Sequence, residues 1–165
     1  MKILFLYAFL GGLMIFSEAN ETKKIVEKEI QFSWKFENHF LQIELESKSP
    51  GWFAVGFNES SDLKGTKLFM ASIDHGRLNL SERQIIDIGI HKSLTELGLT
   101  EEKTIIDFSE TKTVKFLKFK IPIQTRNKFS KDFQSGKVFH ILLAYSLEND
   151  FSHHSIYRTS VKIVL

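Results

Sequence analysis

The segment from Ser49 to Asn58, SPGWFAVGFN, constrains the fold more than any other part of this chain. A Pro-Gly turn leads into an apolar run in which Gly51 and Gly56 flank bulky aromatic residues. Glycine inside a strand leaves room where another backbone, a ring or a ligand must come close. Residues 52–57 are apolar on both faces, which is typical of a central strand in a sandwich. The segment therefore predicts a closely packed position in an antiparallel sheet.

Apolar and polar residues alternate through residues 31–36 and again through residues 41–46, which predicts an antiparallel hairpin that turns at residues 37–39. Residues 92–102 lack strand character and predict a short helical turn or a long loop. Further strands are expected at residues 52–57, 67–74, 77–80, 84–90, 104–108, 114–121, 138–145 and 157–164. About nine to eleven short strands predict one all-β domain, either a sandwich or a barrel.

The first 19 residues are predicted to be a signal peptide. An apolar stretch follows Lys2, and Ser17-Glu18-Ala19 fits a small-x-small cleavage site. The stretch is shorter than the about 20 apolar residues that a spanning helix needs, and an uncleaved anchor is the alternative. We expect a mature domain of residues 20–165 that has no membrane span and is secreted or periplasmic. The chain has no cysteine, which excludes disulfides and thiolate metal sites and suits a bacterial envelope protein.

Charge and motifs exclude several classes of function. The formal charge is +2, and lysines and acids are interleaved without a sustained basic stripe, so nucleic acid is not an expected partner. The sequence contains no nucleophile elbow, no metalloprotease helix motif, no phosphate loop and no dinucleotide fingerprint. We therefore predict no catalytic residues, and we expect a binding or electron-transfer module rather than an enzyme.

Several segments, in this order along the chain, resemble the DOMON domain family. They are Gly51–Asn58, Asp62–Thr66, the Asp74-His75-Gly76 turn, Phe119–Pro122, Leu142–Tyr145 and a histidine before the last strand. The resemblance spans nearly all of the mature chain and is closest to stand-alone secreted bacterial members. It implies an immunoglobulin-like β-sandwich of two antiparallel sheets with a ligand between the sheets. In the family that ligand is heme b in an electron-transfer role or, by proposal, a sugar.

The same resemblance implies the candidate heme-binding residues. The C-terminal axial ligand falls at His153 and His154, of which His154 is the better match, and only one of two adjacent imidazoles is expected to face the ligand. Arg158 is the candidate partner for a propionate or another anion. The methionine ligand of the family falls at Leu63, which cannot bind iron. Met70 is the only methionine of the mature chain, and it is either a weak second ligand or core filler.

Other donors are weighed from their positions in the sequence. His140 lies in a strand beside Leu142 and Ala144, where it is either a hydrogen-bonded structural residue or a ligand. A zinc site built on the two adjacent histidines and Asp150 lacks a further cluster to complete it. The remaining basic donors lie in or near turns or at a strand start and are expected at the surface: His39, His75, His91, Lys64 and Lys67.

The sequence is compatible with two functions. The first is an exported heme b domain that passes electrons to a redox partner protein. The second is a heme-free DOMON module that binds a sugar or a partner protein. Trp34 and Trp52 are the candidate stacking platforms for a sugar, with a place in the core as the alternative for both.

Overall fold

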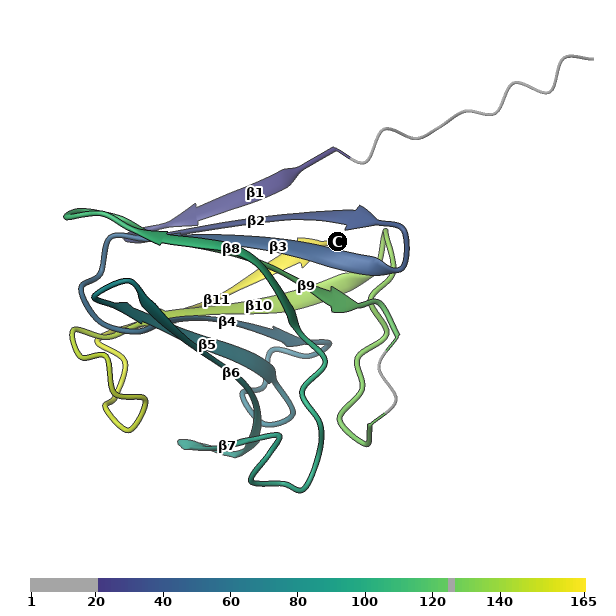
Figure 1. Ribbon diagram of the computed structural model, residues 1–165. Helices are drawn as coiled ribbons and strands as arrows, with labels where there is room; N and C mark the ends of the chain where they lie inside the picture. The colour runs from purple at the N-terminus through teal and green to yellow at the C-terminus, as the bar shows by residue number, and fades with distance from the viewer. Residues whose placement is uncertain (1–20, 125–126) are drawn as a thin grey trace, which may run out of the picture.

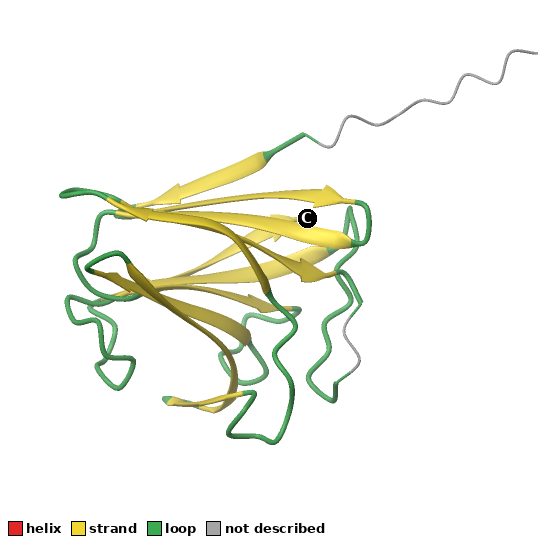
Figure 2. Ribbon diagram, viewed as in Figure 1, coloured by secondary structure: helices red, strands yellow, loops and turns green. Residues whose placement is uncertain are grey.

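The computed structural model describes residues 21–124 and 127–165, which form eleven strands and no helix. The strands make two antiparallel sheets that lie one above the other (Figure 1). The predicted all-β sandwich of two antiparallel sheets is confirmed, with loops as the only other structure in the described residues (Figure 2). The signal peptide predicted for residues 1–19 lies outside the described residues. Because the described residues form no helix, they contain no helical membrane span.

One sheet has five strands in the order β1-β2-β3-β9-β8, and the other has six in the order β11-β10-β4-β5-β6-β7. In Figure 1, β6 bends away from the five-stranded sheet toward β7. The strands are β1 (Lys23–Glu27), β2 (Ile30–Glu37), β3 (Phe40–Ser47), β4 (Phe53–Asn58), β5 (Lys67–Asp74), β6 (Arg77–Asp87), β7 (Ile90–Ser93), β8 (Thr104–Glu110), β9 (Lys115–Pro122), β10 (Val138–Tyr145) and β11 (Tyr157–Val164).

Most strands lie where the alternation predicts them, and β5, β10 and β11 have the predicted bounds. The β2–β3 hairpin turns at Asn38, whose positive φ of 54° is one that asparagine tolerates. The prediction of two separate strands at residues 77–80 and 84–90 is wrong, because β6 is one strand that pairs with β5 without a break. The sequence predicts neither β1 nor a separate strand at β7. Both are short edge strands with exposed side chains, so neither has a clear apolar alternation.

The space between the sheets is filled by apolar side chains. Phe57 is near the middle of this core, and its ring meets those of Phe32, Phe69, Phe133 and Phe139 edge-on, with centroids 5.3 to 6.4 Å apart. All five rings are fully buried. Edge-to-face rings at these separations are a favourable way to fill a core. Phenylalanine therefore occupies the position between the sheets where the ligand was expected.

A second apolar layer covers the outer face of the six-stranded sheet. As predicted, β4 is buried on both faces: Phe53, Val55 and Phe57 belong to the inter-sheet core, whereas Ala54 belongs to the second layer. We call this layer the outer cluster. Its buried members are Trp52, Ala54, Leu68, Met70, Ile85, Leu142 and Ala144, and Leu63 and Phe151 are partly buried against it.

Gly51 and Gly56 both lie at positions of close approach, as the sequence predicts. A Cβ on Gly51 would lie 2.4 Å from the backbone N of Glu148 and 2.4 Å from the carbonyl O of Ser146. A Cβ on Gly56 would lie 2.6 Å from Cγ2 of Thr66. The first glycine therefore admits the backbone of residues 146–148, and the second admits a side chain from the turn before β5.

Lys67 is not at the surface, so that expectation is wrong. Its side chain shares the inner face of β5 with Phe69, and its Nζ lies 2.5 Å from Oε1 of Glu82. Both side chains are buried. The other oxygen of Glu82 accepts the backbone N–H of Glu102 at 2.8 Å, which ties the β7–β8 connection to the sheet. The lysine is the internal counter-ion of this carboxylate and is turned away from the outer face.

Candidate functional site

A cavity of about 660 Å³ lies on the outer face of the six-stranded sheet. This volume is within the range of ligand pockets, which is about 300–1,000 Å³. The outer cluster forms its floor, the β10–β11 connection forms one end, and β6 and β7 with the turn that follows form the other. In Figure 1 the β10–β11 connection and β7 both project on the side away from the five-stranded sheet. The expected ligand position between the sheets is therefore wrong, because that space is packed and the cavity lies on the outer face.

The β10–β11 connection, residues 146–156, is here called the histidine loop. Its first residues extend the pairing with β4, because Trp52 N–H donates to Glu148 O and Ser146 N–H donates to Trp52 O, both at 2.9 Å. The indole Nε1 of Trp52 donates to His153 O at 3.1 Å, and the Ser146 hydroxyl donates to His154 O at 3.1 Å. The backbone at both histidines is thus held by groups fixed at the start of β4 and the end of β10.

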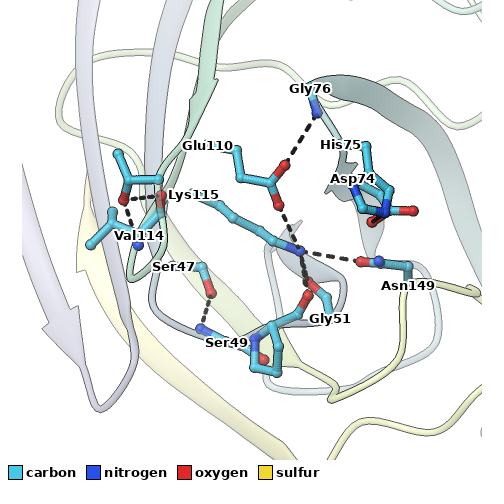
Figure 3. A network of polar contacts seen from close by, with 12 residues as sticks. Ser47, Ser49, Gly51, Asp74, His75, Gly76, Glu110, Val114, Lys115 and Asn149 are labelled. Atoms are coloured by element: carbon cyan, nitrogen blue, oxygen red, sulfur yellow. Dashed lines mark hydrogen bonds and ion pairs between the residues drawn. The ribbon is translucent and has the colours of Figure 1, made fainter.

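Lys115, the first residue of β9, also fixes this region through the hydrogen bonds drawn in Figure 3. Its ammonium donates to the carbonyl oxygens of Pro50 and Gly51 and to Oδ1 of Asn149, the last two at 3.2 Å. Glu110 lies 4.0 Å from Nζ as a partial counter-ion. Burial lowers the pKa of Lys115, while Glu110 and Asp74 act in the opposite direction. One lysine therefore joins the turn before β4 to the histidine loop.

The structure brings all four predicted site residues to one cavity: Met70, His153, His154 and Arg158 line it. Met70 is on the floor and is only 1% exposed, whereas the two histidines and Arg158 are exposed at the rim. Only one of the two imidazoles was expected to face the ligand. Both residues line the cavity, and neither lies in a strand.

Asp150 gives the histidine end of the cavity a fixed negative charge. Its two carboxylate oxygens accept the backbone N–H and the hydroxyl of Ser152 at 2.9 and 2.8 Å. These hydrogen bonds lower the pKa of Asp150, and the charge of His153 contributes in the same direction. Nδ1 of His153 lies 3.9 Å from Oδ2 of Asp150. At this separation the contact is electrostatic and is not a hydrogen bond.

Two residues at the other end, Arg83 and His91, are not predicted by the sequence as site residues. His91 was expected at the surface, but it is half-buried and lines the cavity with Arg83. Nε of Arg83 donates to Nδ1 of His91 at 2.8 Å. Burial lowers the pKa of His91, the Arg83 charge lowers it further, and Glu96 acts in the opposite direction. The pairing depends on the β6–β7 register, which no sequence pattern discloses.

Other predicted candidates lie outside the cavity. His140 lies on the outer face of β10 with Leu142 and Ala144, but it is not among the lining residues. Leu63 packs against the outer cluster. Trp34 is buried in the inter-sheet core and stacks on Phe32 with centroids 4.9 Å apart, so it is not a sugar platform. Among the described residues, no group of three His, Cys, Asp or Glu side chains converges as a metal site would require.

Comparison with known proteins gives the family and the fold. A sequence model of the DOMON domain matches residues 26–146. Among curated proteins, no sequence matches the chain. The cytochrome b domain of pyranose dehydrogenase from Coprinopsis cinerea is similar in structure, with a TM-score of 0.68 at 8% identity over 87% of this chain and 81% of that one. The cytochrome domain of Myriococcum thermophilum cellobiose dehydrogenase has a TM-score of 0.61 at 12% identity, over the same shares of the two chains.

Proposed function

This chain belongs to the DOMON domain family, and from that premise we propose that its outer-face cavity binds heme b in an exported electron-transfer domain. The observation that carries the proposal is the meeting of a methionine and two histidines in one cavity: Met70 on the floor, and His153 and His154 on the histidine loop. The structural neighbours are cytochrome domains, which supports the same ligand.

The donor set fits heme. A six-coordinate heme needs two protein donors, and a thioether with an imidazole is a common pair. Met70 offers a buried thioether among apolar side chains on the floor, and each histidine offers an imidazole from the loop that forms one end of the cavity. The alanines at positions 54 and 144 keep side chains on the floor short, which leaves space for a flat apolar ring.

Bound heme supplies a one-electron couple of its iron, and the protein's part is to hold and shield it. The buried outer cluster excludes water from the floor. Asp150 places a negative charge 3.9 Å from Nδ1 of His153, so His153 is a second candidate beside His154 for the imidazole donor. Arg158 also lines the cavity, but its side chain is exposed at the rim, and a charge that stays in water contributes little to holding an acidic group of the ligand.

An absorption titration with hemin tests the proposal. We expect the purified protein to give a sharp Soret band when hemin is added. The ferric heme should also give a near-infrared band, and this band should be absent from the Met70→Leu variant. One of His153→Ala and His154→Ala should lose the sharp band, while His140→Ala, on the same sheet face but away from the cavity, should keep it. No Soret change in the wild-type protein would exclude heme and leave the sugar or partner-protein alternative.

The export part of the proposal has its own test. The apolar stretch and the small-x-small site at Ser17-Glu18-Ala19 support cleavage before Asn20. N-terminal sequencing of the protein from the secreted or periplasmic fraction should therefore begin at Asn20. Recovery of the intact N-terminus in the membrane fraction would instead support an uncleaved anchor.

A further inference from the structure

The end of the cavity formed by β6 and β7 carries a positively charged side chain that is mostly shielded from water. The side chain of Arg83 is 15% exposed. It lies on the outer face of β6, two residues before Ile85, whose direct partner on β7 is His91. Burial lowers the pKa of Arg83, although Glu96 and Glu101 act in the opposite direction. A guanidinium removed from water needs partners for its N–H groups.

The described partners use only part of the donor capacity of Arg83. Its contacts are Nε to His91, Nη1 to the Ser81 hydroxyl at 3.3 Å and Nη2 to Glu96 at 3.4 Å. A guanidinium has five N–H groups, so these three long or neutral contacts leave two. Glu96 is more tightly engaged elsewhere, because it accepts the backbone N–H and the hydroxyl of Ser93 at 2.6 and 2.7 Å. Glu96 remains the ion-pair partner of Arg83 at 3.4 Å, and the two N–H groups that are left can still take a further acceptor.

His91 is set up as a donor at the same place. Arg83 has only donors, so Nδ1 of His91 must present its lone pair to Nε of Arg83. The neutral ring then carries its proton on Nε2. The tautomer that would bind iron through Nε2 has its proton on Nδ1, where it would face the guanidinium. His91 is therefore unsuited to ligate iron and suited to donate a hydrogen bond.

We propose that Arg83 and His91 form a carboxylate-binding subsite at the β6–β7 end of the cavity, so that its ligand is a largely apolar molecule with a carboxylate at one end. A guanidinium with two spare N–H groups matches a carboxylate, and the outer cluster matches the apolar remainder. This inference shares the cavity with the heme proposal. If the ligand is heme, the carboxylate is a propionate; otherwise it belongs to an iron-free apolar acid.

Arg158 provides a matched control for Arg83. Both arginines line the cavity, but Arg158 is exposed on β11 and no hydrogen bond or ion pair is described for it. A charge that stays in water gains little from an ion pair, whereas a shielded one gains more. The subsite therefore predicts that the loss of Arg83 weakens carboxylate binding and that the loss of Arg158 changes it little.

The test uses iron-free protoporphyrin IX and its dimethyl ester, followed by quenching of tryptophan fluorescence, since Trp52 lines the cavity. The wild-type protein should bind the free acid about 10- to 100-fold more tightly than the ester, the range expected for a charge-assisted hydrogen bond. Arg83→Met and His91→Phe should bind both probes alike. His91→Gln should retain most of the preference, because an amide can accept from Arg83 and still donate. Arg158→Met should behave like the wild type.

The esterified probe tests the subsite on the unmodified protein, so a variant that fails to fold does not decide the result. Equal wild-type affinity for acid and ester, or equal losses in Arg83→Met and Arg158→Met, would overturn the subsite. So would a wild-type protein that binds neither porphyrin nor lauric acid. A strong preference for the free acid without a Soret change on adding hemin supports the subsite and excludes heme. Lauric acid that displaces the porphyrin in wild type but not in Arg83→Met would identify an iron-free acid as the second source of the carboxylate.

Discussion

Gly51→Ala should be the most damaging single methyl group that can be added near the candidate site. The new Cβ would lie 2.4 Å from two backbone atoms, whereas ordinary contact begins near 3.4 Å, so the two chain segments must separate by about 1 Å. Two hydrogen bonds of 2.9 Å, one each way between Trp52 and residues 146–148, span that gap. Each is worth about 0.5–1.5 kcal/mol net, and overpacking costs about 1–3 kcal/mol. We expect Gly51→Ala to lower the free energy of unfolding by about 2–4 kcal/mol.

Gly56→Ala is the matched variant, because its nearest obstacle is a side-chain methyl group. The new Cβ would lie 2.6 Å from Cγ2 of Thr66, and Thr66→Ser deletes that atom while it keeps the hydroxyl that donates to Asp62 O. The double variant Gly56→Ala with Thr66→Ser should therefore recover a large part of the loss. No side-chain deletion can rescue Gly51→Ala, since the obstacle there is backbone.

Urea unfolding followed by tryptophan fluorescence measures these free energies, and a hemin titration at low urea measures the effect on the site. Gly51→Ala displaces the first residues of the histidine loop, so it should weaken hemin binding even where the protein is folded. A Gly51→Ala protein within about 0.5 kcal/mol of the wild type would refute the close approach, because surface substitutions fall in that range. Rescue of Gly51→Ala by Thr66→Ser would contradict the statement that the obstacle at Gly51 is backbone.

Two further predictions concern buried and half-buried charges. Lys67→Met should lower the free energy of unfolding by about 3–5 kcal/mol, because it leaves the buried Glu82 carboxylate without its counter-ion. The double variant Lys67→Met with Glu82→Gln should recover most of that loss in urea unfolding. Equal stability of the single and double variants would contradict an ion pair. Because the pKa of His91 is lowered in the folded protein, this side chain binds a proton more tightly in the unfolded chain. Its contribution to stability should therefore fall as the pH drops below about 6.5, and it should level off below the folded-state pKa. His91→Gln should show a shallower loss of stability in this window, and an unchanged pH profile would mean that the pKa of His91 is not shifted.

The sequence alone is sufficient to predict the strands whose two faces differ in polarity. Alternation specifies β2 and β3, and it separates Phe69 and Ala71 on the inner face of β5 from Leu68 and Met70 on the outer face. It is weak for the short edge strands, where both faces meet water. Lys67 shows another limit, because its burial depends on Glu82, which lies on the neighbouring strand but fifteen positions away in sequence.

The candidate site is only partly visible in the sequence for a related reason. His153 and His154 are predicted because the DOMON resemblance places the C-terminal ligand there, Arg158 because it lies near them, and Met70 because it is the only methionine of the mature chain; the structure brings all four to one cavity. Arg83 and His91 belong to no motif. Their hydrogen bond arises from the β6–β7 pairing and its irregularity between Ile85 and Asp87. One residue of register shift would place the two side chains on opposite faces of the sheet.

The double burial of β4 explains why the cavity is on the outer face. A strand that is apolar on both sides must be covered on both sides, and the inter-sheet core can cover only one of them. No third sheet covers the other side in the described residues. The outer cluster is instead covered in part by the histidine loop, through Phe151, and by the turn that carries Leu63. The remaining apolar floor between the histidine loop and β7 is the cavity itself. An apolar ligand on this floor would complete the burial that the sequence of β4 requires, and this is a physical reason to expect one there.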